Sequence, residues 1–183
     1  MKKRILISQM ITLAVIALAR PDSRKLFVAG FITMLLGQTI RLLSSAAIVK
    51  SKTLATSGPY AAVRNPLYLG TALMTLGLLF MLSSPRRAIL TAAVWGATIA
   101  SYLWIYSKTI KSEEEFLSST YGPQFEAYRK AVPALVPRAA DLKSFFDISA
   151  YSLEIFKKNK EWRGFCAGLA LAAFIFCRIK YGF

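Results

Sequence analysis

Two short polar stretches of this sequence hold the side chains best suited to bind a charged small molecule. The first contains Arg64, and the second contains the consecutive carboxylates Glu113, Glu114 and Glu115, three of only nine acidic residues in the chain. Consecutive side chains of a helix point about 100° apart, so one or two of these carboxylates must face the protein. Carboxylates that lie opposite a guanidinium can bind a zwitterionic or cationic cofactor.

Each polar stretch also has a simpler interpretation. Arg64 stands between Tyr60 and Tyr68, and an arginine flanked by tyrosines can anchor a helix end at a membrane surface. A run of three glutamates can be a solvated acidic patch. The elements that carry these residues therefore decide between the interpretations.

The composition restricts the class of protein. The chain has 183 residues, of which 55% are hydrophobic, and a formal net charge of +15. Disorder is excluded because it requires low hydrophobicity, and no nucleic-acid partner is expected because the apolar residues form long runs rather than leaving a basic surface stripe. The chain has no histidine and two cysteines, so we expect no metal site and no disulfide scaffold. A small integral membrane protein with basic loops fits these figures.

Five apolar segments predict an all-α fold with about five transmembrane helices, because spanning a hydrocarbon core of about 30 Å takes roughly 20 helical residues. The first segment could also be a signal peptide that is cleaved after Ala17-Leu18-Ala19, but a retained helix is favoured because a hydrophobic hairpin follows directly. The segments are Ile5–Ala19, Leu26–Val49, Pro66–Leu82, Ala88–Tyr106 and Gly164–Cys177.

Lysine and arginine counts predict the orientation of the chain. With a cytoplasmic N-terminus, the inside holds three basic residues at the N-terminus, four from Arg41 to Arg64 and ten from Lys108 to Arg163, against seven outside. This asymmetry is the one that the positive-inside rule requires. Residues 50–65 and 107–162 then share the cytoplasmic face, and we expect any chemistry there.

Helix breakers mark the connections between the segments. The proline turn at Ser83–Arg87 predicts an antiparallel hairpin of the third and fourth segments. The fourth helix is expected to continue past Lys111 and to stop at Gly122-Pro123, where a short helix begins. Residues 138–162 are basic and mildly amphipathic, which predicts a helix lying on the anionic inner leaflet.

Two motifs, in this order, resemble a known superfamily. Residues 58–70 read Gly-Pro-Tyr-x-x-Val-Arg-Asn-Pro-x-Tyr-x-Gly, and residues 113–122 read Glu-Glu-x-x-Leu-x-x-x-Tyr-Gly. Together with Tyr128 and Val132-Pro133, they resemble the isoprenylcysteine carboxyl methyltransferase and phospholipid methyltransferase superfamily, in its short bacterial-type membrane form. The resemblance covers residues 50–137.

The resemblance implies a methyltransferase of the bacterial inner membrane that uses S-adenosylmethionine without a Rossmann domain. Its N-terminus and site would be cytoplasmic, and its acceptor would be an isoprenylcysteine-like carboxylate or a related lipid. Arg64 and Glu114 would be catalytic, Glu113 and Glu114 would hold polar groups of the cofactor, and residues 132–137 would close over it. The residues lining the cofactor pocket would be Tyr60, Arg64, Asn65, Tyr68, Leu69 and Gly70.

Asn65 departs from the superfamily motif, which usually has histidine at this position. An amide can still form hydrogen bonds, but it cannot titrate near neutral pH. Methyl transfer from a sulfonium needs alignment more than a base, so carboxylate or thiolate acceptors on a lipophilic molecule are favoured. Two alternatives stay open: an intramembrane NADPH-dependent reductase of the sterol-reductase kind, and a non-catalytic membrane protein that retains the fold.

On this interpretation the chain has three parts. Residues 1–49 form an N-terminal transmembrane hairpin, residues 50–137 form the catalytic core, and residues 138–183 form a basic interfacial segment followed by a C-terminal transmembrane helix. The expected partners are membrane lipids and a lipophilic substrate. The sequence identifies neither the methyl acceptor nor the oligomeric state.

Overall fold

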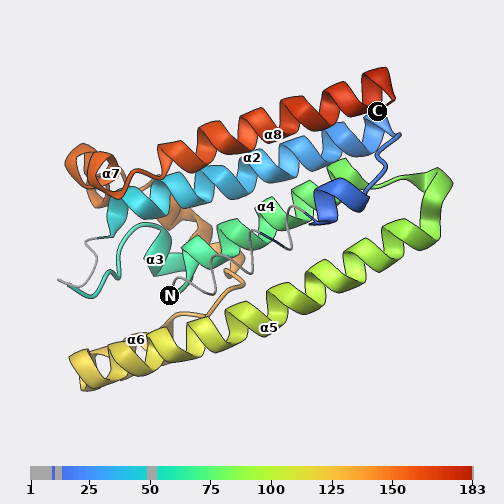
Figure 1. Cartoon of the computed structure of the whole chain (residues 1–183). Coiled ribbons are helices and arrows are strands. Elements are labelled where there is room, and N and C mark those ends of the chain that lie inside the picture. Colours follow the sequence, from blue (N-terminus) through green and yellow to red (C-terminus); the bar gives the residue numbers. More distant parts are fainter. Residues whose placement is uncertain (1–9, 11–13, 49–52, 183) are drawn as a thin grey trace.

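The fold comes from a computed structural model that describes residues 10, 14–48 and 53–182. Every regular element within these residues is helical, which confirms the predicted all-α class. Figure 1 shows the long helices running side by side, with the short helices labelled α3, α6 and α7 near one end. The α-helices are α2 (Arg24–Ala47), α3 (Pro59–Ala62), α4 (Pro66–Leu82), α5 (Ala88–Tyr121), α6 (Pro123–Ala131), α7 (Leu153–Asn159) and α8 (Trp162–Tyr181), and the 3₁₀ helices are η1 (Pro85–Arg87), η2 (Ala139–Phe146) and η3 (Ile148–Ala150).

Three of the described helical segments are long and apolar enough to cross a membrane, namely Arg24–Ala47, Pro85–Tyr121 and Trp162–Tyr181. Their length and composition are those of an integral membrane protein. The apolar helix α4 has 17 residues, which at 1.5 Å per residue gives about 26 Å, slightly less than a hydrocarbon core. The predicted first span, Ile5–Ala19, falls largely outside the described residues, so the number of five spans stays a prediction.

Helices α2 and α4 pack closely because glycines face each other at two levels. A Cβ atom added at Gly37 would lie 2.5 Å from the carbonyl oxygen of Gly70, and one added at Gly77 would lie 2.5 Å from that of Gly30. On each helix the two glycines are seven residues apart, which is about two helical turns. Small residues at such spacings let membrane helices approach closely. The α2–α4 pair is thus the closely packed centre of the bundle.

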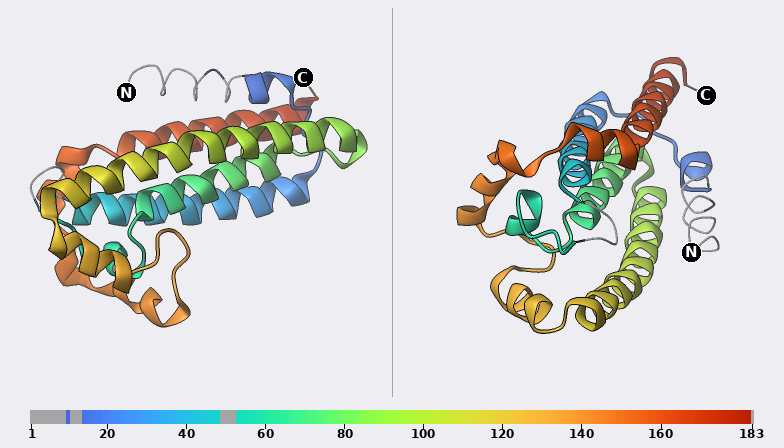
Figure 2. Two further views of the ribbon diagram at one scale, coloured as in Figure 1. Left: turned by 90° about the horizontal axis from the view of Figure 1, so that it is seen from below. Right: turned by 90° about the vertical axis from the view of Figure 1, so that its left-hand side faces the viewer.

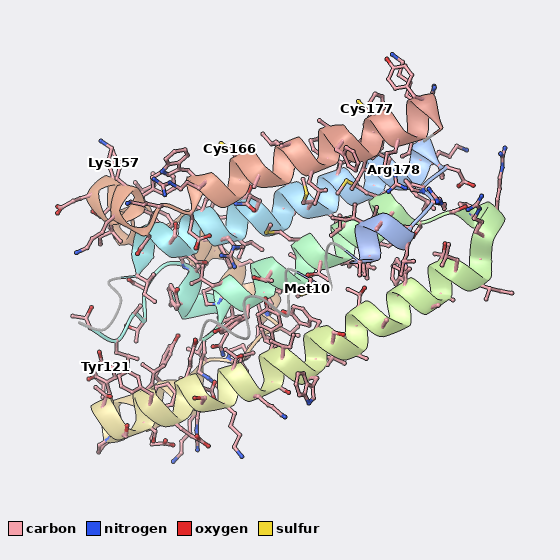
Figure 3. All side chains as sticks on the ribbon, viewed as in Figure 1. Met10, Tyr121, Lys157, Cys166, Cys177 and Arg178 are labelled. Atoms are coloured by element: carbon pink, nitrogen blue, oxygen red, sulfur yellow. The ribbon has the colours of Figure 1, made fainter. Side chains whose placement is uncertain are left out.

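Helices α5 and α8 flank this central pair, as the end-on view in Figure 2 shows. The side chain of Arg178, labelled in Figure 3, joins α8 to the segment before α2. Its two terminal nitrogens donate to the carbonyl oxygens of Ile16 at 2.7 Å and Ala19 at 2.9 Å. Leu79 and Ile175 are buried between the helices at this end. The C-terminal helix is therefore fixed to the rest of the bundle rather than lying loosely beside it.

The helical hairpin and the long helix α5 agree with the sequence prediction. Helix α5 continues without interruption to Tyr121, which Figure 3 labels at its far end. Gly122 then adopts a φ of 50°, a backbone region that favours glycine, and α6 starts with Pro123. The carboxylates Glu113 and Glu114 consequently lie on a rigid helix that extends beyond the apolar part of α5.

The prediction of one interfacial helix over residues 138–162 is wrong. The segment instead forms η2, η3 and α7. The side chains of Asp147 and Ser152 each accept a backbone N–H at the start of a new helix, which divides the segment into short pieces. The Asn159 amide then donates to the carbonyl oxygen of Ser45 at 2.7 Å, so the segment folds back against the end of α2.

Candidate active site

Helix α4 begins directly after Arg64 and Asn65 because Pro66 occupies its first position, where a missing N–H costs no hydrogen bond. The backbone N–H groups of Arg64 and Asn65 donate instead to the carbonyl oxygens of Pro133 at 2.9 Å and Ala134 at 3.1 Å. The connector after α6, which bends at residues 134–136, therefore runs alongside the start of α4 at Pro133 and Ala134. The two polar stretches lie at the same end of the bundle, as the sequence predicts.

The side chain of Arg64 connects α4 to α5 and α6. Its Nε and Nη2 atoms both donate to the Oε1 oxygen of Glu114, each at 2.9 Å. Its Nη1 atom donates to the carbonyl oxygens of Arg129 at 2.9 Å and Val132 at 2.6 Å. The side chains of Arg64 and Glu114 are only 13% and 19% exposed, so solvent screens this ion pair less than it screens a surface pair.

Asn65 shares the same carboxylate oxygen. Its Nδ2 atom donates to Oε1 of Glu114 at 3.3 Å and to the carbonyl oxygen of Ala134 at 3.2 Å. The amide therefore supplies hydrogen bonds at the position where the superfamily usually has histidine. One oxygen of Glu114 thus receives hydrogen bonds from both neighbouring residues of the first motif.

The three consecutive glutamates have three different surroundings. Glu114 faces Arg64 and Asn65, whereas Glu113 accepts a hydrogen bond of 2.6 Å from the hydroxyl of Tyr68. Glu115 is exposed and makes no hydrogen bond or ion pair with any residue that the structure describes. The prediction that one or two of the carboxylates face the protein is confirmed. A uniformly solvated acidic patch does not describe this run.

Two tyrosines of α5 that the sequence analysis did not single out lie against Tyr68. The ring of Tyr106 meets the Tyr68 ring edge-on at 5.4 Å and stacks on the Tyr102 ring at 4.3 Å. The hydroxyl of Tyr102 donates to the backbone carbonyl of Tyr68 at 2.9 Å. Tyr102 and Tyr106 are four residues apart, which places both on one face of a helix. This spacing is the sequence signal that could have identified them.

Tyr60 of α3 is buried, with 6% of its surface exposed. Its hydroxyl has no hydrogen-bond partner among the described residues. Burial raises the pKa of this hydroxyl far above its ordinary value, and the nearby Tyr128 and Glu113 raise it further. The Tyr128 hydroxyl donates to the Tyr60 carbonyl at 2.7 Å, and burial raises the pKa of Tyr128 as well. Both phenols therefore stay neutral hydrogen-bonding groups across the physiological pH range.

The remaining predicted pocket residues lie further along α4. Gly70 belongs to the contact with α2, since an added Cβ atom would lie 2.6 Å from the carbonyl oxygen of Gly37. Leu69 is half-buried. The structure thus brings Arg64, Asn65 and Tyr68 together with the two glutamates, and it places Gly70 on the opposite, helix-packing face.

Two cavities border this constellation. A polar one of about 400 Å³ lies between α5 and α6, and Glu114 is the only predicted site residue in its lining. An apolar one of about 340 Å³ lies among α2, α4, α5 and α8, and both Tyr102 and Tyr106 line it. The tyrosine cluster therefore separates the charged part of the site from an apolar cavity.

Arg41 supports the site from the side of α2. Its guanidinium donates to the carbonyl oxygen of Leu67 at 3.3 Å, to the Thr71 hydroxyl at 2.6 Å and to a Glu161 oxygen at 2.7 Å. Arg41 thus ties the first turns of α4 to the start of α8. Sequence reasoning could not pair Arg41 with Glu161, because 120 residues separate them along the chain.

These features define an all-helical membrane protein with a partly buried Arg–Glu site at the start of one helix of a hairpin. The profile of the phospholipid methyltransferase family matches residues 25–124, more than half of the chain. The chain belongs to this family, and the superfamily resemblance of the two motifs is confirmed.

Named relatives agree with the family assignment. The chain is 33% identical to the protein-S-isoprenylcysteine O-methyltransferase of Schizosaccharomyces pombe, over 55% of this chain and 40% of the relative. It is 31% identical to the enzyme of that name from Xenopus laevis, over 64% of this chain and 43% of the relative. It is also 37% identical to the cobalt-zinc-cadmium resistance protein CzcN of Cupriavidus metallidurans, over 49% of this chain and 38% of the relative.

In each of these comparisons the chain covers less than half of the relative's length. No solved structure matches the chain.

Proposed function

We propose that this protein is a membrane-embedded methyltransferase that uses S-adenosylmethionine to methylate a lipophilic acceptor. The observation that carries the proposal is the Glu114 carboxylate, which receives hydrogen bonds from both Arg64 and Asn65. These residues come from the two motifs that mark the family, 50 and 49 positions apart in sequence. Family membership supports the reaction class.

The side chains gathered here fit the chemical groups of S-adenosylmethionine. The carboxylates of Glu113 and Glu114 suit an ammonium group or ribose hydroxyls, and the Arg64 guanidinium suits a carboxylate. The tyrosine rings beside them suit a positively charged sulfonium, which is attracted to an aromatic face. The buried Tyr60 hydroxyl, which has no partner among the described residues, is a further donor for a bound polar group, because such groups are normally hydrogen-bonded.

When bound, the cofactor supplies an electrophilic methyl group. The protein's own residues bind, orient and exclude water, and alignment alone can contribute about 7–11 kcal/mol to such a transfer. Arg64 orients a carboxylate, either of the cofactor or of the acceptor. Residues 132–137 lie over the start of α4 through the backbone bonds of Pro133 and Ala134, a position suited to covering a bound cofactor.

The acceptor class follows from what Asn65 can and cannot do. An amide cannot take a proton from an amine nucleophile at neutral pH, whereas a carboxylate or thiolate needs no such base. The apolar cavity beside Tyr102 and Tyr106 suits the hydrocarbon part of the acceptor. We therefore propose a lipophilic carboxylate or thiolate as the acceptor, in an isoprenylcysteine-like or related lipid.

The proposal also includes the location of the site and the extent of the catalytic core. The excess of basic residues between Lys108 and Arg163 supports a cytoplasmic site in a bacterial inner membrane. Residues 50–137 supply all the side chains of the Arg–Glu site, which supports treating them as the catalytic core.

Calorimetric titration of the full chain in nanodiscs with S-adenosylmethionine tests the cofactor assignment. We expect saturable binding that weakens about tenfold in Glu114→Gln, because the variant removes the negative charge but keeps the shape. Glu154→Gln, on the exposed face of α7, is the matched control and should bind as the wild type does. Binding of NADPH instead of S-adenosylmethionine would overturn the proposal in favour of a reductase.

A further inference from the structure

Three of the four residues that α8 contributes to the wall of the apolar cavity are small. Gly164, Ala167, Gly168 and Leu171 of α8 all line it, at a spacing of three, four and seven residues. Residues with this spacing share one face of a helix. The wall lies on α8, beyond residues 25–124 that match the family profile.

The glycines of this wall differ from those of the α2–α4 contact. A Cβ atom added at Gly164 would meet nothing within 4 Å, and one added at Gly168 would meet only the Met34 sulfur at 3.9 Å. At Gly37, by contrast, an added Cβ would lie 2.5 Å from a backbone oxygen. Helix packing therefore requires Gly37 but neither glycine of α8. Gly168 also lies in the interior of α8, where only proline is less favourable than glycine. Another reason is therefore needed for a glycine at this position.

The cavity adjoins the candidate active site at the tyrosine cluster. Tyr102 and Tyr106 line it and also contact Tyr68, whose hydroxyl donates to Glu113. Thr71 lines it and accepts a hydrogen bond from Arg41. An amphiphile whose chain filled the cavity would therefore place its polar head beside the tyrosines and within reach of charged groups. This proximity of an apolar cavity to charged groups fits a lipophilic acceptor.

The wall is also held in a fixed position. At the start of α8, Glu161 accepts from Arg41 at 2.7 Å. Near its end, Arg178 donates to two backbone carbonyls of the segment before α2. A helix held at both ends cannot easily move aside for a larger ligand. The size of the side chains with which α8 lines the cavity then limits the room on this side.

We propose that Gly164 and Gly168 are specificity-determining residues, which keep the cavity open for a single hydrocarbon chain of the acceptor and set the chain length that fits. The inference rests on the proposed function, because it assigns the cavity to the acceptor. A volume of about 340 Å³ lies at the lower end of the range of about 300–1,000 Å³ that is usual for ligand pockets. Such a volume suits one chain rather than a two-chain phospholipid.

The test measures how the full chain in nanodiscs binds S-octyl, S-dodecyl and S-hexadecyl derivatives of N-acetylcysteine, which carry a carboxylate head. Gly168→Leu adds four carbon atoms to the cavity wall and should weaken binding of the hexadecyl probe by at least about tenfold, since each methylene that loses its burial costs about fourfold in affinity. Binding of the octyl probe should change less than about threefold, because a short chain need not reach the wall residue. Gly164→Leu provides an independent second variant. Gly164 lies one turn nearer than Gly168 to Glu161 and to the polar end of the cavity, so this variant should weaken binding of all three probes.

Gly96→Leu is the matched control. Gly96 is an exposed residue of α5 that does not line the cavity, and an added Cβ atom there would meet nothing within 4 Å. Its substitution should therefore leave the affinities for all three probes unchanged. Unchanged hexadecyl binding in both α8 variants, or an equal loss in Gly96→Leu, would overturn the inference. Weaker binding of all three probes by the same factor in Gly168→Leu would overturn it as well.

This experiment is independent of the cofactor test, because the alkyl probes are measured without S-adenosylmethionine. Cofactor binding without chain-length selectivity would overturn the α8 inference and leave the proposed function standing. Absence of cofactor binding in the wild type would overturn the proposed function, whatever the probes show.

Discussion

The Nε and Nη2 atoms of Arg64 donate to a single oxygen of Glu114, each at 2.9 Å, across 50 residues of sequence. This pair joins the start of α4 to the extended end of α5. The second oxygen of Glu114 takes no part in these bonds and stays available to another donor. The pair therefore has two functions that experiment can separate: it holds the helical hairpin together, and it presents a carboxylate to a ligand.

Arg64→Lys should disrupt both functions while keeping the charge. Lysine cannot reproduce the planar fork that reaches Glu114 and two backbone carbonyls at once. We expect the free energy of unfolding to fall by about 1–3 kcal/mol and the affinity for S-adenosylmethionine to fall about tenfold. Thermal unfolding and calorimetric titration in nanodiscs measure these effects. Arg87→Lys, at the opposite end of α4, is the control, and an equal loss there would contradict a specific role for Arg64.

Tyr60→Phe should separate ligand binding from stability. The Tyr60 hydroxyl is buried and has no partner among the described residues, so its removal should leave the free energy of unfolding unchanged or raise it by about 1 kcal/mol. The affinity for S-adenosylmethionine should fall by about threefold or more if this hydroxyl is a ligand donor. Undiminished affinity in the variant would exclude Tyr60 from the cofactor site.

The raised pKa of Tyr60 also predicts an alkaline loss of stability. In the folded protein the phenol keeps its proton, whereas in the unfolded chain it ionises near pH 10. Above that pH the unfolded state binds fewer protons than the folded state, so stability falls as the pH rises. Below about pH 9 this group should contribute no pH dependence. Unfolding of Tyr60→Phe followed across the same pH range should show a smaller alkaline decline, and an identical decline would contradict the assignment.

Asn65→His should introduce a pH dependence that the wild type lacks. The chain contains no histidine, so we expect cofactor binding by the wild type to be nearly constant from about pH 6 to pH 8. A histidine beside Glu114 would have a pKa above about 6.5, and its protonated form would neutralise the carboxylate. The affinity of the variant should therefore weaken about threefold to tenfold as the pH falls through that pKa. A flat profile would show that residue 65 does not act through Glu114.

Glu161→Gln should weaken the attachment of α8 to α2 and leave the Arg64–Glu114 pair unchanged. Arg41 and Glu161 are 24% and 18% exposed, and the substitution removes the counter-ion from a partly buried guanidinium. We expect a loss of about 1–2 kcal/mol in the free energy of unfolding. A double-mutant cycle with Arg41→Gln, read by thermal unfolding, measures the coupling directly. Additive losses would show that the two side chains do not interact in the membrane.

Much of this architecture could be predicted from local sequence signals. The breakers at Pro85 and Gly122 determine where α5 starts and ends, and the absence of a breaker after Lys111 predicts its extension beyond the apolar part. The predicted closeness of Arg64 to the glutamates is confirmed, because an antiparallel hairpin must bring those ends together. Helix continuity and hairpin geometry are local properties, which explains why the sequence reveals them.

Features that depend on distant contacts could not be predicted in the same way. The segment after residue 138 looks amphipathic, but it is divided into short helices, and hydrogen bonds from Asn159 fold it back against the end of α2. The role of Gly70 in helix packing becomes visible only once α2 lies against α4. The small residues of α8 form a cavity wall only because α2, α4 and α5 complete the cavity. Each of these depends on tertiary partners that no local pattern specifies.

The most direct measurement of the central claim is the transfer of a deuterium-labelled methyl group. The full chain in nanodiscs is incubated with methyl-deuterated S-adenosylmethionine and an extract of bacterial membrane lipids, and the products are followed by mass spectrometry. We predict that the label enters a lipophilic carboxylate or thiol, and that Arg64→Lys and Glu114→Gln reduce the transfer at least about tenfold while Glu154→Gln does not. Binding of S-adenosylmethionine with no transfer to any lipid of the extract would contradict the account and indicate a non-catalytic member of the family.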